Sequence, residues 1–343
     1  MSFRNFRSGT LYFFWPAISL SVILILISII GILCSVTMQR FISDAFIKVI
    51  IVVGLYIFIG NSGIISFGHA SFMTIAAYMS AWLTMPVAFK KLILPLLWPF
   101  FLNLQMNHYI GLIIAAIIAS IFAFVVGIPL MRLSGLAASI ATFALLSIVY
   151  TIYGNWDSKT YGQGTLVGLD IYVNLSLTLL IAIGAIIFAF IYQESRWGVA
   201  LRASREDEVA AKACGISIVS QRIIAFVLSA FIVSIGGVLR GHFLGTLWIN
   251  DYYLDLTFLS IAMLVVGGIH SLAGAVLGPL IISSLLELLR LLEVGMTFGS
   301  FSFRAPSGLR ETGVAFVMLL ILIFRPSGIM GGNEISWPFK SRS

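Results

Sequence analysis

The chain has 343 residues, of which 60% are hydrophobic and only 10% are charged. A soluble domain carries about 25% charged residues, so these proportions exclude an ordinary soluble fold. A net charge of +7 on a soluble protein would suggest nucleic-acid binding, but the basic residues lie mostly at the ends of apolar runs, where they act as topology signals. We therefore predict an all-α polytopic membrane protein with no nucleic-acid partner, built as a single transmembrane domain over residues 1–343.

Continuous apolar runs predict about ten membrane-spanning helices, because most are close to the roughly 17–25 residues that cross a bilayer. The strands of a β-barrel would instead alternate apolar and polar side chains. The first run is too long for the apolar part of a cleaved signal peptide, so we expect it to stay as a span. The predicted spans are 11–36, 43–60, 65–84, 109–131, 135–152, 171–193, 222–245, 256–269, 272–292 and 311–325.

Residues 85–108 are apolar as well, but they contain three prolines and the pair Lys90 and Lys91. Proline removes a backbone donor and interrupts a helix. We therefore expect this segment to form an outside loop or a re-entrant piece and not an eleventh span.

Small residues interrupt the apolar pattern near 61–71 and again near 267–279. The two places share a local pattern, Gly63-Ile64-Ile65-Ser66 and Gly268-Ile269-His270-Ser271, each before a run of small residues. Broken helices at matching places in two pseudosymmetric halves are typical of transporters whose pathway lies at the repeat interface. Close helix packing through small residues is the alternative, and both stay open. The candidate pathway residues are Gly63, Ser66, His69, Ser71, Gly268, His270 and Ser271.

His69 and His270 have two interpretations. An ionisable side chain inside a span is costly and often functional, which favours a role in solute binding or gating. A neutral imidazole that bonds a carbonyl freed at the helix break is the structural interpretation. The sequence leaves both possibilities open.

The segment 194–222 is the one long polar run in an otherwise apolar chain. It predicts a helix over 203–214, with Ser204 as the N-cap, three acidic residues in the first turn, and Gly215 at the end. A short helix with one face of small residues suits insertion into a groove of a soluble partner. An interfacial helix on anionic lipid is the alternative, but three consecutive acidic residues disfavour it.

Charge counting predicts the orientation. If both termini and the 194–222 segment are cytoplasmic, eleven of the 20 basic residues and five of the 13 acidic residues lie inside. The net charges are then +6 inside (11 − 5) and +1 outside (9 − 8). This distribution follows the positive-inside tendency, so we expect both termini in the cytoplasm.

Several motifs together resemble one family of transport proteins. The polar segment contains RWGVALRASREDEVAAKACGI, and other matching stretches lie at 54–83, 127–150, 266–281 and 324–331. As a set they resemble the branched-chain amino-acid ABC transporter permeases, most closely the LivM-like subunit. The resemblance covers about residues 45–331. One departure is that Val209 stands where importer permeases in general carry the glutamate of Glu-Ala-Ala-x-x-x-Gly.

The resemblance implies a permease subunit of an importer for branched-chain or other hydrophobic amino acids, in a bacterial inner membrane. Urea, short amides or aromatic acids are alternative solutes. It also implies a second, LivH-like permease, two ATP-binding subunits that drive alternating access, and a periplasmic or lipid-anchored substrate-binding protein. In the family the polar segment is a coupling loop on the ATPase. Here the implied contact residues are Arg202, Arg205, Glu206, Glu208, Ala210, Ala211 and Gly215.

The residues themselves suggest no catalysis. Neither metal-ligand spacing, nor a nucleophile with its base, nor a phosphate-binding glycine loop with its lysine is present, so we expect no catalytic residue, metal or cofactor. An ion-coupled secondary transporter is the less favoured rival. Beyond the two histidines, its coupling groups could only be Asp44, Lys48, Arg240 and Glu287, near span ends.

Overall fold

The computed structural model describes residues 10–335 except 295, 299–300, 304–305 and 307. The chain termini, including Arg4, Arg7, Lys340 and Arg342 of the orientation count, lie outside the described residues. Ten helices coincide with the ten predicted spans. They are α1 (Thr10–Leu33), α2 (Val36–Ser62), α3 (His69–Thr84), α6 (His108–Leu130), α7 (Gly135–Gly154), α9 (Leu175–Glu194), α12 (Ile218–Leu244), α13 (Leu254–Gly267), α14 (Leu272–Val294) and α15 (Leu309–Phe324).

The prediction of an all-α polytopic membrane protein is confirmed, and the number of spans is approximate. Within the described residues, eight helices are long and apolar enough to cross a membrane. A ninth is obtained by joining α3 to α4 (Val87–Ile93) across a bend of 117°. The apolar part of α15, Thr312–Phe324, is shorter.

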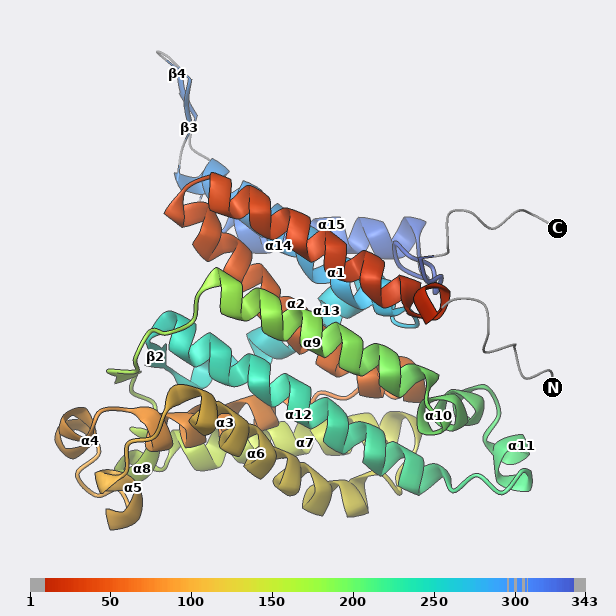
Figure 1. Cartoon of the computed structure of the whole chain (residues 1–343), viewed down its shortest axis with the longest axis horizontal. Coiled ribbons are helices and arrows are strands. Elements are labelled where there is room, and N and C mark those ends of the chain that lie inside the picture. Colours follow the sequence, from red (N-terminus) through yellow and green to blue (C-terminus); the bar gives the residue numbers. More distant parts are fainter. Residues whose placement is uncertain (1–9, 295, 299–300, 304–305, 307, 336–343) are drawn as a thin grey trace.

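The remaining elements are short and lie at the ends of the bundle (Figure 1). One end carries α10 (Arg196–Glu206) and α11 (Glu208–Ala213), and we call it the α10–α11 end. The opposite end carries α4, α5 (Pro99–Asn103), α8 (Asp157–Thr160) and the 3₁₀ helix η1 (Ile249–Tyr252). Two antiparallel strand pairs complete the list, β1 (Leu166–Val167) with β2 (Thr246–Leu247), and β3 (Met296–Phe298) with β4 (Phe301–Phe303).

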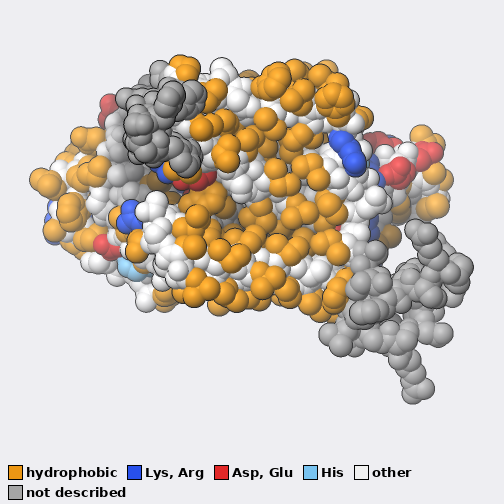
Figure 2. All heavy atoms as spheres, turned by 90° about the horizontal axis from the view of Figure 1, so that it is seen from above, with side chains coloured by type: hydrophobic (Ala, Val, Ile, Leu, Met, Phe, Trp, Pro, Cys, Tyr) orange, Lys and Arg blue, Asp and Glu red, His pale blue; other side chains and the backbone are white. Residues whose placement is uncertain are grey.

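The surface has the pattern expected of a chain surrounded by lipid. Figure 2 shows apolar side chains over the middle of the molecule and charged side chains gathered toward its two ends. This distribution matches a hydrocarbon band between two aqueous faces.

Helices α2 and α12 form the centre, and glycine lets α12 approach α3 closely. A Cβ atom on Gly237 of α12 would lie 2.7 Å from Cα of Met73 in α3. On the other side, Ser229 of α12 donates a hydrogen bond of 2.6 Å to the carbonyl of Gly54 in α2. Small residues are the usual means by which helices associate in lipid, where the hydrophobic effect does not drive them together.

Helices α13 and α14 form a tight hairpin that is closed by the segment after α15. A Cβ atom on Gly274 would lie 2.6 Å from the carbonyl oxygens of Gly267 and Gly268. Residues 329 and 330 donate their backbone N–H groups to the carbonyls of residues 266 and 267, at 2.9 and 3.0 Å. Both carboxylate oxygens of Glu334 accept backbone N–H groups from the first turn of α14. The late segment thus satisfies the polar groups at both sides of the hairpin turn.

Both predicted interruptions are present. The first is the stretch 63–68 between α2 and α3, and the second is 268–271 between α13 and α14. Each begins with a glycine in a conformation that L side chains rarely adopt, Gly63 with φ 72° and Gly268 with φ 124°. Both glycines donate their N–H group to the carbonyl four residues earlier, but only Gly63 has the left-handed conformation usual after a helix, because ψ of Gly268 is 109°.

The ambiguous segment 85–108 folds into the two short helices α4 and α5. The amine of Lys90 is buried and donates to the carbonyls of Trp82 (2.8 Å), Phe101 (3.0 Å) and Leu104. Lys90 thereby fastens the end of α3 to α5. In the sequence Lys90 counted against a membrane span, whereas in the structure its amine makes hydrogen bonds inside the protein.

The close approach at Gly237 yields a stability prediction. We expect Gly237→Ala to destabilise the protein by about 1–3 kcal/mol, because overpacking a filled site costs that much. Thermal unfolding of the detergent-solubilised protein measures it. Gly184→Ala in α9 is the matched control, since a Cβ atom there meets nothing within 4 Å. An equal response of both variants would contradict the close packing of α12 on α3.

Candidate functional site

The polar segment forms two helices where the sequence predicted one. α10 ends at Glu206 and α11 begins at Glu208. The predicted N-cap, Ser204, lies inside α10 and donates to the carbonyl of Leu201 at 2.7 Å. Asp207 is the actual cap, because its carboxylate accepts the N–H groups of Val209 (2.8 Å) and Ala210 (3.0 Å). The predicted helix over 203–214 was therefore wrong at its start.

The predicted end of this helix was correct. Gly215 has φ 80°, and its N–H group bonds the carbonyl of Lys212 at 2.9 Å. The next N–H, of Ile216, bonds the carbonyl of Ala211 at 3.1 Å. These two bonds are a Schellman motif, which requires a left-handed residue after the helix.

α11 presents small apolar residues to the outside. Val209 is 78% exposed, and Ala210, Ala213 and Cys214 are exposed as well, whereas Ala211 is buried against the protein. Several apolar side chains on a six-residue helix are unfavourable in water unless a partner covers them.

Glu208 faces inward. Its carboxylate pairs with Arg222 of α12, whose side chain is only 6% exposed. Arg222 also donates to the carbonyl of Leu133, at the turn before α7. This ion pair, buried on the side of Arg222 while Glu208 stays 40% exposed, fixes α11 to the bundle.

Arg205 connects the polar segment to both interruptions. Its Nη1 donates to the carbonyl of Gly60 at 2.7 Å and lies 2.9 Å from Nδ1 of His270. Its aliphatic part covers Gly63, where an added Cβ atom would lie 2.8 Å from Arg205 Cγ. The guanidinium also pairs with Glu206 at 2.6 Å. A cation at the end of α2 is favourable because helix C-termini carry partial negative charge. We call these five residues the Arg205 junction.

Two carboxyl groups at this end have pKa values shifted in opposite directions. The hydrogen bond and charge of Arg205 lower the pKa of the exposed Glu206 carboxyl. Burial raises the pKa of the Glu334 carboxyl, although the two N–H donors from α14 act against that rise. Glu334 is thus a poorly hydrated group whose ionised form depends on the helix start it caps.

The predicted pathway residues occupy two different environments. Gly63 and His270 are exposed at the α10–α11 end. Buried positions hold the remaining five, which are Ser66, His69, Ser71, Gly268 and Ser271. The structure therefore brings Gly63 and His270 to the Arg205 junction and leaves the others in the interior.

His69 and His270 are not equivalent. His69 is fully enclosed among three phenylalanine rings, and its Nδ1 lies 2.9 Å from Oγ of Ser66. In the described residues its Nε2 has no hydrogen-bond partner. His270 instead faces the aqueous end beside Arg205.

Two residues of α7 support the first interruption and were not predicted. Ser139 donates to the carbonyl of Ile65 at 2.7 Å, and Thr142 accepts the N–H of Phe67 at 3.3 Å. Their spacing of three places both hydroxyls on one face of a helix. This shared face was the available sequence signal for the two residues. It is a weak signal, because Ser and Thr hydroxyls in a helix also bond the backbone of their own helix.

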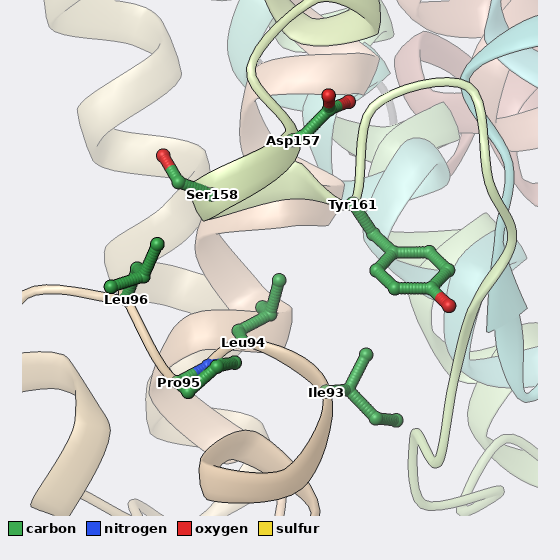
Figure 3. Close-up of a pocket in the computed structure, with 7 residues that line it drawn as sticks. All are labelled: Ile93, Leu94, Pro95, Leu96, Asp157, Ser158 and Tyr161. Carbon is green, nitrogen blue, oxygen red and sulfur yellow. The ribbon is translucent and has the colours of Figure 1, made fainter.

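A cavity of about 430 Å³ lies at the opposite end of the molecule (Figure 3). The turn after α4 forms one wall and α8 the other, with residues Ile93, Leu94, Pro95, Leu96, Asp157, Ser158 and Tyr161. None of the predicted site residues lines it.

Comparison with known proteins decides the family. Residues 37–324 match the family model described as branched-chain amino acid transport system / permease component. The chain belongs to this permease family.

Individual relatives agree with the family. The permease LivM of Escherichia coli (strain K12) is 24% identical, over 83% of this chain and 68% of its own length. A probable LivM of Methanocaldococcus jannaschii is 29% identical, over 66% of this chain and 70% of its own. LivH of Escherichia coli is 31% identical but matches only 41% of this chain and 42% of its own. No solved structure matches.

The cap at Asp207 can be tested directly. We expect Asp207→Ala to speed amide hydrogen exchange in 208–214, because losing an N-cap costs about 0.5–2 kcal/mol of helix stability. Ser217→Ala is the control, since Ser217 precedes α12 without a side-chain bond to its backbone. Unchanged exchange in the Asp207 variant would show that α11 is held by other contacts.

Proposed function

We propose that the chain is one permease subunit of an ATP-binding-cassette importer that moves branched-chain or other hydrophobic amino acids across a bacterial inner membrane. A second, LivH-like permease, two ATP-binding subunits and a periplasmic or lipid-anchored binding protein complete the importer. The 194–222 segment and both termini lie in the cytoplasm. The chain performs no chemistry, and ATP is hydrolysed on its partners.

The observation that carries this proposal is the Arg205 junction. One side chain on the polar segment bonds the end of α2 and the turn between α13 and α14. A displacement of α10 by a docked ATPase would therefore reach both interruptions at once. Packed cores and hydrogen-bonded turns switch between discrete arrangements, and this property makes alternating access possible.

The names of the relatives support the proposed solute class. Proteins named as branched-chain amino acid permeases match along most of this chain, and the LivM relatives match more of it than LivH does. The LivM-like position is therefore assigned to this chain, and the LivH-like position to a partner.

Ion coupling receives less support. Asp44 pairs with Lys48 at 2.6 Å and lies 3.9 Å from Arg240, while Glu287 pairs with Arg290 at 2.6 Å. These paired groups already neutralise one another. A proton- or sodium-binding group would need to exchange its charge during each cycle.

Arg205→Ala should uncouple the importer. We expect uptake per ATP hydrolysed to fall by about tenfold, because hydrogen bonds from a charged donor contribute about 1.5–3 kcal/mol each. Uptake and ATPase activity of the complete importer in proteoliposomes provide the measurement.

Arg196→Ala is the matched control on the same helix, because Arg196 is exposed and its guanidinium lies over the ring of its neighbour Trp197, away from the junction. If the Arg205 variant retains normal coupling, the junction does not transmit the movement. Uptake that persists without any ATP-binding subunit would contradict the proposal that the chain belongs to an ATP-driven importer.

The exposed face of α11 gives a separate prediction. Ala210→Glu should abolish co-purification of the ATP-binding subunit, since a buried unpaired charge costs several kcal/mol at an interface. Ala203→Glu on the exposed side of α10 should leave co-purification intact. Equal binding by both variants would exclude α11 as the docking element.

A further inference from the structure

The first interruption exposes non-helical backbone on one face of the bundle. Side chains alternate along it, with Gly63 and Ile65 exposed and Phe67 partly exposed, while Ile64 and Ser66 are buried. This period of two is that of extended chain.

Two aromatic side chains flank Phe67 on this face. Its ring centroid lies 6.1 Å from that of Phe143 in α7 and 5.8 Å from that of Phe258 in α13. Phe143 is 37% exposed, Phe258 52% and Ile65 39%. We call Ile65, Phe67, Phe143 and Phe258 the aromatic face.

The aromatic face lies near the middle of the membrane. Phe143 follows the start of α7 by eight residues and Phe258 precedes the end of α13 by nine. Both of those helix ends are at the α10–α11 end, as the contacts of Leu133 and His270 show. At 1.5 Å per residue both rings lie about 12–14 Å from that end, roughly half of a 30 Å hydrocarbon core.

Lipid cannot cover this face. Irregular backbone at membrane depth is found only where protein buries it or where it borders water. α7 satisfies one edge of the segment through Ser139 and Thr142, but the residues facing away from α7 are exposed. The second permease or an aqueous pathway must therefore lie against the aromatic face.

The two ends of this face favour a pathway. Toward the α10–α11 end it continues to the exposed residues Gly63 and His270, beside Arg205. Toward the opposite end the rings of Tyr150 and Tyr253 stack at 3.9 Å, and Tyr150 donates to the side chain of Asn250 at 2.7 Å. The stacked tyrosines thus close the aromatic face toward the opposite end, and the exposed residues Gly63 and His270 open it to water at the α10–α11 end.

We propose that Phe67, Phe143 and Phe258 contact the apolar side chain of the solute inside the aqueous pathway, which the second permease subunit completes. This inference rests on the proposed function and assigns the solute contact to named residues. Three phenylalanine rings offer a large apolar surface against which an aliphatic side chain packs.

Thiol accessibility tests the aqueous exposure without requiring transport. Cys34 and Cys214 are both free and are first replaced by serine. Ile65→Cys and Phe258→Cys are then exposed, in membrane vesicles, to a charged water-soluble methanethiosulfonate. We expect modification several-fold faster than at Ile121→Cys, a 58% exposed position in the middle of α6 where we expect lipid to cover the side chain. Rates as slow as that control would overturn the proposal.

Selectivity tests the solute contact. In the complete importer, Phe143→Ala should reduce uptake of leucine relative to alanine by about tenfold, since a lost apolar contact is worth about 1–3 kcal/mol. Phe122→Ala is the matched control, because Phe122 is also 37% exposed but lies on α6.

An unchanged leucine-to-alanine ratio in the Phe143 variant would overturn the assigned contact while wild-type uptake still supports the importer. Absence of amino-acid uptake by the wild type would instead contradict the proposed function, and the thiol rates would still decide whether the face borders water.

Discussion

The structure depends on one constraint, which is that polar backbone groups inside a membrane need partners other than water. Where a helix stops within the bundle, this chain supplies those partners from neighbouring elements. Ser139 and Thr142 bond the stretch after α2, and residues 329–334 bond both sides of the turn between α13 and α14. These side-chain and backbone contacts make it possible for the two interruptions to exist.

The two interruptions have different surroundings at different depths in the membrane. Their ends at the α10–α11 end meet around Arg205, whose guanidinium reaches both. The deeper part of the first interruption holds Phe67 between two other rings. The proposed mechanical contact and the proposed solute contact therefore share one short stretch of extended chain, so a shift at Gly63 would also be a shift beside Phe67.

The sequence predicted the spans well because a continuous apolar run has few alternatives in lipid. It also predicted the two interruptions and the end of α11, since glycine is strongly favoured where φ is positive. The predicted start of α11 was wrong because Ser204 and Asp207 are both good caps, and in the structure Ser204 bonds a carbonyl inside α10 while Asp207 caps α11. Arg205 could be named as a loop residue, but its contacts with Gly60 and His270 are separated by 145 and 65 residues and leave no local pattern.

The closure of the α13–α14 turn by Glu334 also bears on how the protein is made. Glu334 bonds Leu272 across 62 residues of sequence, so the turn acquires these caps only after synthesis has passed residue 334. Until then the N–H groups at the start of α14 lack this partner, and His270 lies beside an unfinished turn. The C-terminal segment therefore completes the start of α14 last, and a chain truncated before Glu334 would leave the N–H groups of Leu272 and Ala273 without these acceptors.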